Sequence, residues 1–111
     1  MENLYIYKAR VKRIIDGDTI IADIDLGFNV WIKDVRVRLA RIEAPNKKNG
    51  LEQWERSKKA LADKLLMEEE IIIKTIKDKE DKYGRMLGEI WLDKENINSW
   101  MVEKGYATIY G

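Results

Sequence analysis

Residues 30–42 read VWIKDVRVRLARI, and the centre of this stretch alternates between apolar and charged side chains. Successive side chains of a β-strand point to opposite faces, so Val35, Val37 and Leu39 share one face. The charged residues between them, including Arg38, share the other. The pattern predicts a strand over 30–42 that directs Arg38 away from the core.

Further elements are expected on both sides of this strand. Two strands precede it and form a hairpin around Asp16-Gly17-Asp18, whose residue types favour a turn. Pro45 ends the strand. The two preceding strands are expected at 5–15 and 19–26. The other expected elements are strands at 70–77 and 86–92, helices at 51–67 and 97–104, a loop at 46–50, a charged turn at 78–84 and an extended tail at 106–110. These elements indicate an α+β arrangement around one small barrel, in a single domain that covers residues 1–111.

Two capping residues define the second helix. Asn96 precedes it as an N-cap, and Gly105 follows it in the C-terminal capping position. Three of the tryptophans, Trp54, Trp91 and Trp100, are expected in the core.

Composition excludes several kinds of chemistry. The 111 residues include 21 basic and 20 acidic side chains, a net charge of +1, so gross charge alone does not hold this chain on nucleic acid. There is no cysteine and no histidine, which removes disulfides, thiolate nucleophiles and histidine acid/base catalysis. No stretch has the length or hydropathy of a membrane span or of a leader, so we expect a cytoplasmic protein. Secretion of a longer precursor stays open.

Two acids are candidate metal ligands. Asp18 follows the Asp-Gly turn, and Glu43 stands at the end of the long predicted strand. If the barrel brings these two positions together, they can share a hard cation such as Ca²⁺, which prefers oxygen ligands. The alternatives are an ordinary turn residue for Asp18 and a solvated acid for Glu43.

Two arginines, Arg38 and Arg85, are candidate phosphate ligands, because a guanidinium offers a planar fork of donors and stays charged. Surface ion pairing is the alternative. Tyr83 has a ring that can stack on a base, and Lys82 carries a charge that can follow a nucleic-acid backbone. Half-buried packing and solubility are their respective alternatives.

Four runs occur in a fixed order: Asp16 to Thr19, Arg38 to Arg41, Glu43 to Asn46 and Asp81 to Arg85. Together they resemble the staphylococcal nuclease (thermonuclease) family, over about residues 9–107. The resemblance implies a five-stranded OB-fold barrel with two helices and Ca²⁺-dependent cleavage of DNA and RNA phosphodiester bonds.

The same resemblance implies roles for individual residues. It makes Asp18 a calcium ligand, Arg38 and Arg85 the catalytic phosphate-binding arginines, and Tyr83 part of the nucleotide pocket. The expected partners are single-stranded or denatured DNA and RNA, bound by a monomer.

This sequence departs from the family at three site positions. Glu43 stands where an Asp ligand is found, and Ala44 replaces a Thr whose main-chain carbonyl is a ligand, a contact that Ala44 can keep. Asn46 falls at the position of the Glu that is held to activate the attacking water. The sequence also ends at Gly111, before the final C-terminal helix of longer members.

Asn46 separates two functional hypotheses, because a carboxamide positions water but does not accept its proton. General-base catalysis contributes about 10²- to 10⁴-fold, so its loss predicts a weak nuclease rather than a dead one. The alternative is a catalytically inactive nucleic-acid-binding module of the same fold. A structural OB domain without a nucleic-acid role is a third, less favoured reading. Glu52 and Glu55 are possible substitute bases, although acids in the first turns of a helix are more simply explained by the helix dipole.

Overall fold

The computed structural model describes residues 4–66, 68, 70–80 and 86–110, and for residues 4 and 76–80 only the backbone. The elements are strands β1 (Leu4–Asp16), β2 (Thr19–Asp25), β3 (Trp31–Leu39), β4 (Ile42–Glu43), β5 (Ile71–Glu80), β6 (Met86–Leu92), β7 (Glu95–Asn96) and β8 (Thr108–Ile109), the 3-10 helix η1 (Lys47–Asn49), and the α-helices α1 (Leu51–Leu65) and α2 (Ile97–Glu103).

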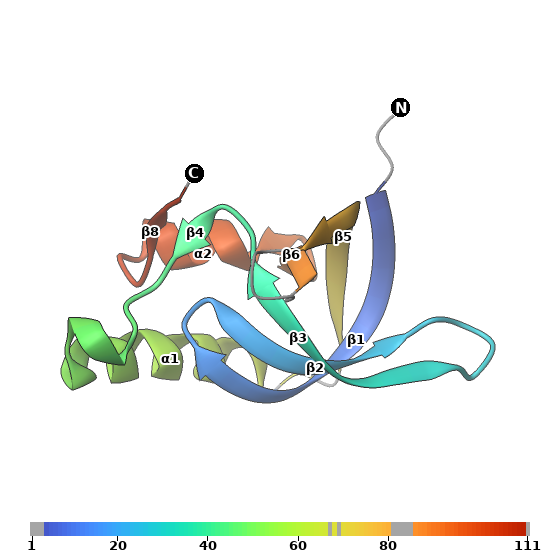
Figure 1. Cartoon of the computed structure of the whole chain (residues 1–111), viewed down its shortest axis with the longest axis horizontal. Coiled ribbons are helices and arrows are strands. Elements are labelled where there is room, and N and C mark those ends of the chain that lie inside the picture. Colours follow the sequence, from blue (N-terminus) through green and yellow to red (C-terminus); the bar gives the residue numbers. More distant parts are fainter. Residues whose placement is uncertain (1–3, 67, 69, 81–85, 111) are drawn as a thin grey trace.

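Five strands close into a barrel (Figure 1). The long strand β1 pairs with β5 through its first half and with β2 through its second half, both antiparallel. β3 pairs antiparallel with β2 and parallel with β6. The parallel pairing, in which Val37–Leu39 lie beside Met86–Gly88, closes the barrel. The architecture is mainly β with two α-helices, consistent with the expected OB-fold.

The core fills the barrel and continues under both helices. Fully buried side chains come from the barrel strands, from α1 and from α2; they include Ile20, Leu39, Ile73, Ile90, Leu61, Leu65, Ile97 and Met101. In Figure 1 both helices lie at the end of the barrel that holds the β1–β2 turn, and the β2–β3 hairpin projects from the opposite end. None of the helices in the described part of the chain is long and apolar enough to cross a membrane.

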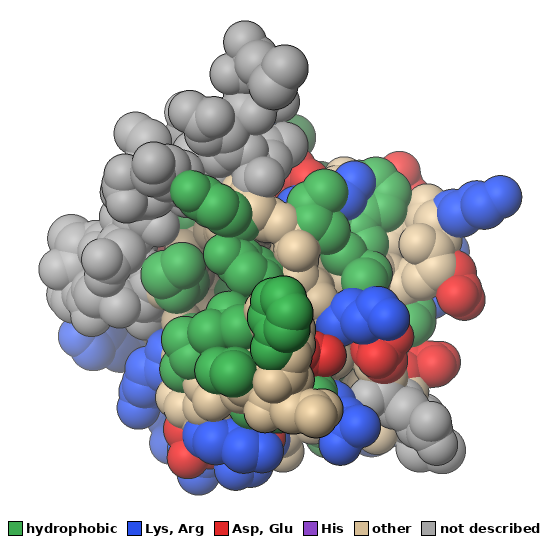
Figure 2. Space-filling model, turned by 90° about the vertical axis from the view of Figure 1, so that its right-hand side faces the viewer, with side chains coloured by type: hydrophobic (Ala, Val, Ile, Leu, Met, Phe, Trp, Pro, Cys, Tyr) green, Lys and Arg blue, Asp and Glu red, His purple; other side chains and the backbone are tan. Residues whose placement is uncertain are grey.

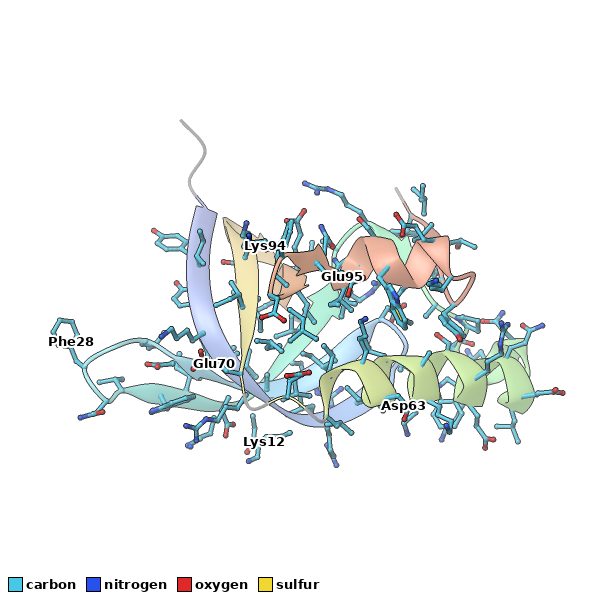
Figure 3. The ribbon with its side chains drawn as sticks, turned by 180° about the vertical axis from the view of Figure 1, so that it is seen from behind. Lys12, Phe28, Asp63, Glu70, Lys94 and Glu95 are labelled. Atoms are coloured by element: carbon cyan, nitrogen blue, oxygen red, sulfur yellow. The ribbon has the colours of Figure 1, made fainter. Side chains whose placement is uncertain are left out.

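The projecting hairpin carries exposed apolar side chains. Figure 2 looks onto this side of the molecule, where hydrophobic side chains gather, and Phe28 is fully exposed. Figure 3 shows Phe28 at the tip, directed away from the barrel. Its backbone is left-handed, with a φ of 56°, as is that of Asn29, with a φ of 62°. Left-handed backbone at two successive residues is the geometry of a tight hairpin turn, and Phe28 lies in this turn.

The strand expected over 30–42 is two strands, not one. β3 ends at Leu39, and Arg41 has a φ of 67°, a left-handed conformation that interrupts an extended chain. β4 then turns away and pairs with β8 in a separate two-stranded sheet. Glu43 consequently belongs to this small ribbon and not to the barrel strand that carries Arg38. β8 lies within the expected extended tail.

Other boundaries also differ from the sequence prediction. The expected loop 46–50 contains the 3-10 helix η1. β5 continues to Glu80, so the first part of the expected turn 78–84 is strand, and the rest lies outside the described residues. The caps predicted for α2 are confirmed: Asn96 Oδ1 accepts from the Ser99 N–H at 3.2 Å, and Gly105 has a φ of 79°.

The prediction that three tryptophans lie in the core was wrong. Trp54, Trp91 and Trp100 are all half-buried. A lysine lies over each ring: Lys47 and Lys58 over Trp54, Lys74 over Trp91, and Lys64 over Trp100. Lysine stems cover apolar surface while their ammonium groups stay in water, so the Trp54 and Trp91 rings pack at the surface. Trp100 packs against the core without being fully buried.

Candidate functional site

The turn between β1 and β2 is wedged against α1. A Cβ atom added at Gly17 would overlap the Ser57 hydroxyl and approach the Ala44 Cβ to 2.9 Å. Ser57 is itself buried and donates its hydroxyl to the Tyr106 carbonyl at 2.9 Å. The glycine therefore permits the close approach that places the turn against both α1 and the segment after β4.

Asp18 is buried at the start of β2, with its carboxylate already engaged. Its Oδ2 accepts a hydrogen bond from the Ala44 N–H at 2.8 Å, and its Oδ1 accepts from the Thr19 hydroxyl at 3.0 Å. The backbone N–H of Leu39 also donates to the Asp18 carbonyl, at 2.7 Å. These bonds join the β1–β2 turn to the ends of β3 and β4.

Arg38 lies next to Asp18. The β2–β3 register pairs Thr19 with Arg38, and the Nη1 atom of Arg38 is 3.6 Å from Asp18 Oδ2. The same Nη1 donates to the Leu39 carbonyl at 2.7 Å, and the guanidinium lies 5.8 Å from the ring centroid of Tyr110. The side chain leaves the core face, as predicted, but only 11% of it is exposed. Its hydrogen bond and ion pair with described residues use only Nη1, so this largely buried guanidinium has further donors that suit an incoming anion.

Glu43 and Ala44 lie at the segment that meets Asp18. Glu43 is exposed on β4, where its carbonyl accepts from the Thr108 hydroxyl at 3.4 Å, and Ala44 is buried. The chemistry of this donor set fits a hard cation: two carboxylates and a main-chain carbonyl, all oxygen. Within the described residues, however, no three acidic side chains converge as a ready-made metal cluster.

Asn46 has a structural role that the sequence did not reveal. It is exposed, and its Oδ1 accepts from the Lys48 N–H at 2.8 Å as the N-cap of η1. The Asn49 side chain accepts in return from the Asn46 N–H at 2.9 Å. The carboxamide oxygen thus stabilises this turn.

Glu52 and Glu55 are both exposed at the start of α1, and among the described residues neither forms a hydrogen bond or ion pair with Asp18 or Arg38. Three other predicted site residues, Lys82, Tyr83 and Arg85, lie outside the described part of the chain.

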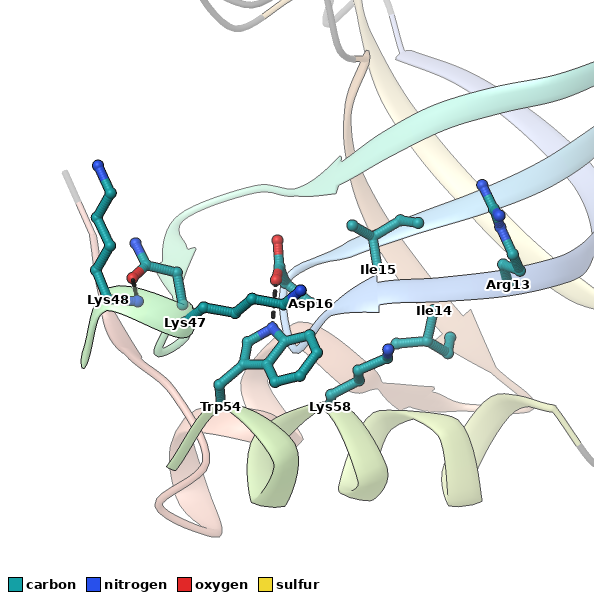
Figure 4. Close-up of a pocket in the computed structure, with 9 residues that line it drawn as sticks. Arg13, Ile14, Ile15, Asp16, Lys47, Lys48, Trp54 and Lys58 are labelled. Atoms are coloured by element: carbon teal, nitrogen blue, oxygen red, sulfur yellow. Dashed lines mark hydrogen bonds between the residues drawn. The ribbon is translucent and has the colours of Figure 1, made fainter. Parts of the chain in front are cut away.

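Sequence reasoning missed a pair on the other side of the turn. The indole N–H of Trp54 donates to Asp16 Oδ1 at 2.6 Å. These two residues line a hollow of about 520 Å³ between the end of β1, η1 and the start of α1 (Figure 4). The available signal was a tryptophan among lysines near the start of a helix, together with a second aspartate in the turn.

The chain belongs to the staphylococcal nuclease family, because the family model described as "Staphylococcal nuclease homologue" matches residues 36–111. It is 37% identical to "Protein ParB" of Escherichia coli over 112 residues, which cover 93% of this chain and 57% of that protein. It is 36% identical to an "Uncharacterized endonuclease" of Escherichia coli O157:H7 over 106 residues, 91% of this chain and 60% of the relative.

A third relative carries the name that the resemblance led us to expect. "Thermonuclease" of Staphylococcus intermedius is 34% identical over 100 residues, 87% of this chain and 56% of that protein. In each of these three comparisons the chain spans less than two thirds of the relative's length.

Proposed function

We propose that this chain is a phosphodiesterase domain that cleaves DNA or RNA at the Asp18–Arg38 site, with low turnover. The observation that carries the proposal is the half-buried Arg38 guanidinium, held 3.6 Å from the Asp18 carboxylate, in a chain of a nuclease family. Single-stranded or denatured nucleic acid is the proposed substrate, as the relationship to the nuclease family suggests.

The arginines supply the electrostatic part of catalysis. Arg38 binds a phosphoryl oxygen and stabilises the negative charge that grows there during hydrolysis. Arg85 is proposed as the second such arginine, with Tyr83 and Lys82 as contacts to the bound strand; these three assignments rest on the sequence alone. Removing one preorganised donor from such a site typically lowers the rate by about 10²- to 10³-fold.

A divalent cation is the proposed cofactor, with Ca²⁺ favoured by an all-oxygen donor set. Asp18, Glu43 and the Ala44 carbonyl would hold it, and bound there it would polarise the phosphoryl group. The Ala44 N–H bond to Asp18 orients the carboxylate whether or not a cation is present. Without a cation, Arg38 is the positive charge nearest to that carboxylate among the ion pairs of the described chain.

Asn46 is the reason to expect low turnover. Its side chain cannot accept a proton from water, and its oxygen caps η1. This arrangement also supports the alternative function, a module that binds nucleic acid in the same place and does not cut it.

The deciding experiment is digestion of denatured DNA by the wild type, Asn46→Glu and Asn46→Asp, each with Ca²⁺ and with EDTA. Aspartate is as good an N-cap as asparagine, so Asn46→Asp adds a carboxylate while it keeps η1 capped. Arg38→Met is the negative control. We expect slow Ca²⁺-dependent cleavage by the wild type and at least about a tenfold gain in one carboxylate variant.

The outcomes separate the two functions. Cleavage that disappears in EDTA and in Arg38→Met supports the nuclease. No cleavage by any variant, with retained binding of a labelled oligonucleotide, supports the binding module. If no variant cleaves DNA and none binds the labelled oligonucleotide, both functions are refuted.

A further inference from the structure

The hollow beside Trp54 adjoins the proposed catalytic site, and Asn46 is among the residues that line it. Its walls come from the end of β1, from η1 and from α1. Asp16, on one wall, is separated from Asp18 only by Gly17, and Lys47, on another, directly follows Asn46. A strand bound at the Asp18–Arg38 site therefore has this hollow within reach.

The hollow concentrates positive charge in a chain that is almost neutral overall. Arg13, Lys47, Lys48 and Lys58 all line it, and Asp16 is its single acidic residue. Among ion pairs between described residues, none of these four cations is paired with a carboxylate. Asp16 is already engaged by the Trp54 indole. The positive charge of these four side chains is thus available to an anionic ligand.

Trp54 provides a fixed aromatic surface within that charge. Its N–H is held by Asp16 at 2.6 Å, while the ammonium groups of Lys47 and Lys58 lie 4.8 and 4.7 Å from the ring centroid (Figure 4). An exposed cation–π contact is worth about 0.5–1 kcal/mol. Stacking of a base on an aromatic side chain is worth about 1–3 kcal/mol. A base can therefore replace a lysine on the ring, and the released lysine can bind the adjoining phosphate.

We propose that this hollow is an accessory nucleotide subsite, in which Trp54 stacks a base of a single-stranded substrate while Lys47 and Lys58 bind its phosphate. The strand extends from the Asp18–Arg38 site past η1 into the hollow. The inference rests on the proposed function for the identity of its ligand, and it predicts that affinity rises with strand length. Stacking and phosphate binding are both independent of base sequence, so the subsite tolerates any base.

The test measures binding of fluorescently labelled dT2 and dT8 by anisotropy, in EDTA and at several salt concentrations. The subsite variant is Lys47→Gln/Lys58→Gln. Its matched control is Lys94→Gln/Lys104→Gln, which removes two exposed lysines that do not line the hollow. Trp54→Leu tests stacking, and circular dichroism shows whether each variant is folded.

We expect the subsite variant to bind dT8 at least about tenfold more weakly than the wild type does. Loss of two phosphate contacts lowers the slope of log affinity against log salt by about 1.4. Folded Trp54→Leu loses about five- to hundred-fold in dT8 affinity. The subsite variant should bind dT2 as tightly as the wild type does. The control variant should bind dT8 as tightly as the wild type does.

Failure of this inference can be distinguished from failure of the proposed function. If the subsite and control variants bind dT8 equally while Arg38→Met loses cleavage, the subsite is refuted and the nuclease stands. If the subsite variant loses dT8 binding but no variant cleaves DNA, the subsite stands as part of a binding module. A wild type that binds neither oligonucleotide refutes the subsite, and it refutes the nuclease as well if no variant cleaves DNA.

Discussion

The guanidinium of Arg38 lies 3.6 Å from the carboxylate of Asp18, and only 11% and 10% of these two side chains are exposed. Strand pairing brings them together, since Thr19 is the β-sheet partner of Arg38. The two charges neutralise each other in a partly desolvated place, where removal of one leaves the other uncompensated. Loss of either charge is therefore expected to destabilise the fold, in addition to any effect on the proposed phosphate site.

Substitution Asp18→Asn tests this dual role. The amide oxygen can still accept from the Ala44 N–H, but the charge opposite Arg38 is lost. We expect a loss of about 1–3 kcal/mol in the free energy of unfolding and a fall of at least about 10²-fold in Ca²⁺-dependent cleavage. Urea denaturation and a digestion assay measure the two effects. Unchanged cleavage would remove Asp18 from the proposed cation site.

Substitution Gly17→Ala tests the close approach of the β1–β2 turn to α1. The new methyl group meets the Ser57 hydroxyl and the Ala44 side chain, and overpacking of this kind typically costs about 1–3 kcal/mol. Ser57→Ala removes the nearest atom, so the double variant should be more stable than the sum of the two single effects predicts. A strictly additive thermal-denaturation cycle would contradict the contact.

Asn98 forms hydrogen bonds with backbone groups near the β3–β6 pairing that closes the barrel. This buried side chain donates to the carbonyls of Ala40 and Gly88, at 2.9 and 3.1 Å, and accepts from the Ile90 N–H at 3.1 Å. Asn98→Ala removes all three of these hydrogen bonds, although the Gly88 carbonyl still accepts from the Ala40 N–H at 2.9 Å, so we expect a loss of about 2–4 kcal/mol. Chemical denaturation measures it, with Ser99→Ala, at an exposed neighbouring position, as the control. Equal stability of the two variants would refute this role.

Asp23 gives the hairpin a predictable response to acid. The Asp34 N–H donates to its carboxylate at 3.0 Å and, with Lys12 and Lys33 nearby, lowers the pKa of Asp23 below its ordinary 3.8. A carboxyl whose folded-state pKa is lowered stabilises the fold above its unfolded pKa, and that contribution disappears as pH falls through the folded value.

The corresponding variant is Asp23→Asn. We expect it to be less stable than the wild type at pH 7, with a difference that shrinks below about pH 3.8 as the wild-type carboxyl is protonated. Urea denaturation at pH 7 and at about pH 3 provides the comparison. A stability difference that is the same at both pH values would mean that the charge of Asp23 contributes nothing.

Local patterns were enough to predict most of the architecture. Alternation identified β1 and β3, and strands were also predicted at the positions of β2, β5 and β6. The residue types of Asn96 and Gly105 identified both ends of α2. Such signals depend on neighbouring residues, which is why a single sequence carries them. The ordered motifs likewise led to the nuclease family without any knowledge of contacts.

Local patterns failed where a distant segment decides the conformation. Arg41 breaks the long strand through a left-handed backbone, and the partner of the short strand that follows is β8, more than sixty residues away in sequence. Trp54 looks apolar in sequence, but its indole is bound by Asp16 and its ring is covered by lysines. Both outcomes depend on a partner more than thirty residues away in sequence, which local patterns do not identify.

The sequence by itself determined which chemistry is available: carboxylates, arginines and a carboxamide at the position of the expected base, with no cysteine or histidine. The tertiary structure decided which of these groups meet. It placed Arg38 beside Asp18, and it joined Asp18 to Ala44 by a hydrogen bond. It also made Asn46 the N-cap of the 3-10 helix η1. Residue types set charge and proton affinity, whereas distance between groups depends on strand register and barrel closure, which arise from contacts across the whole chain.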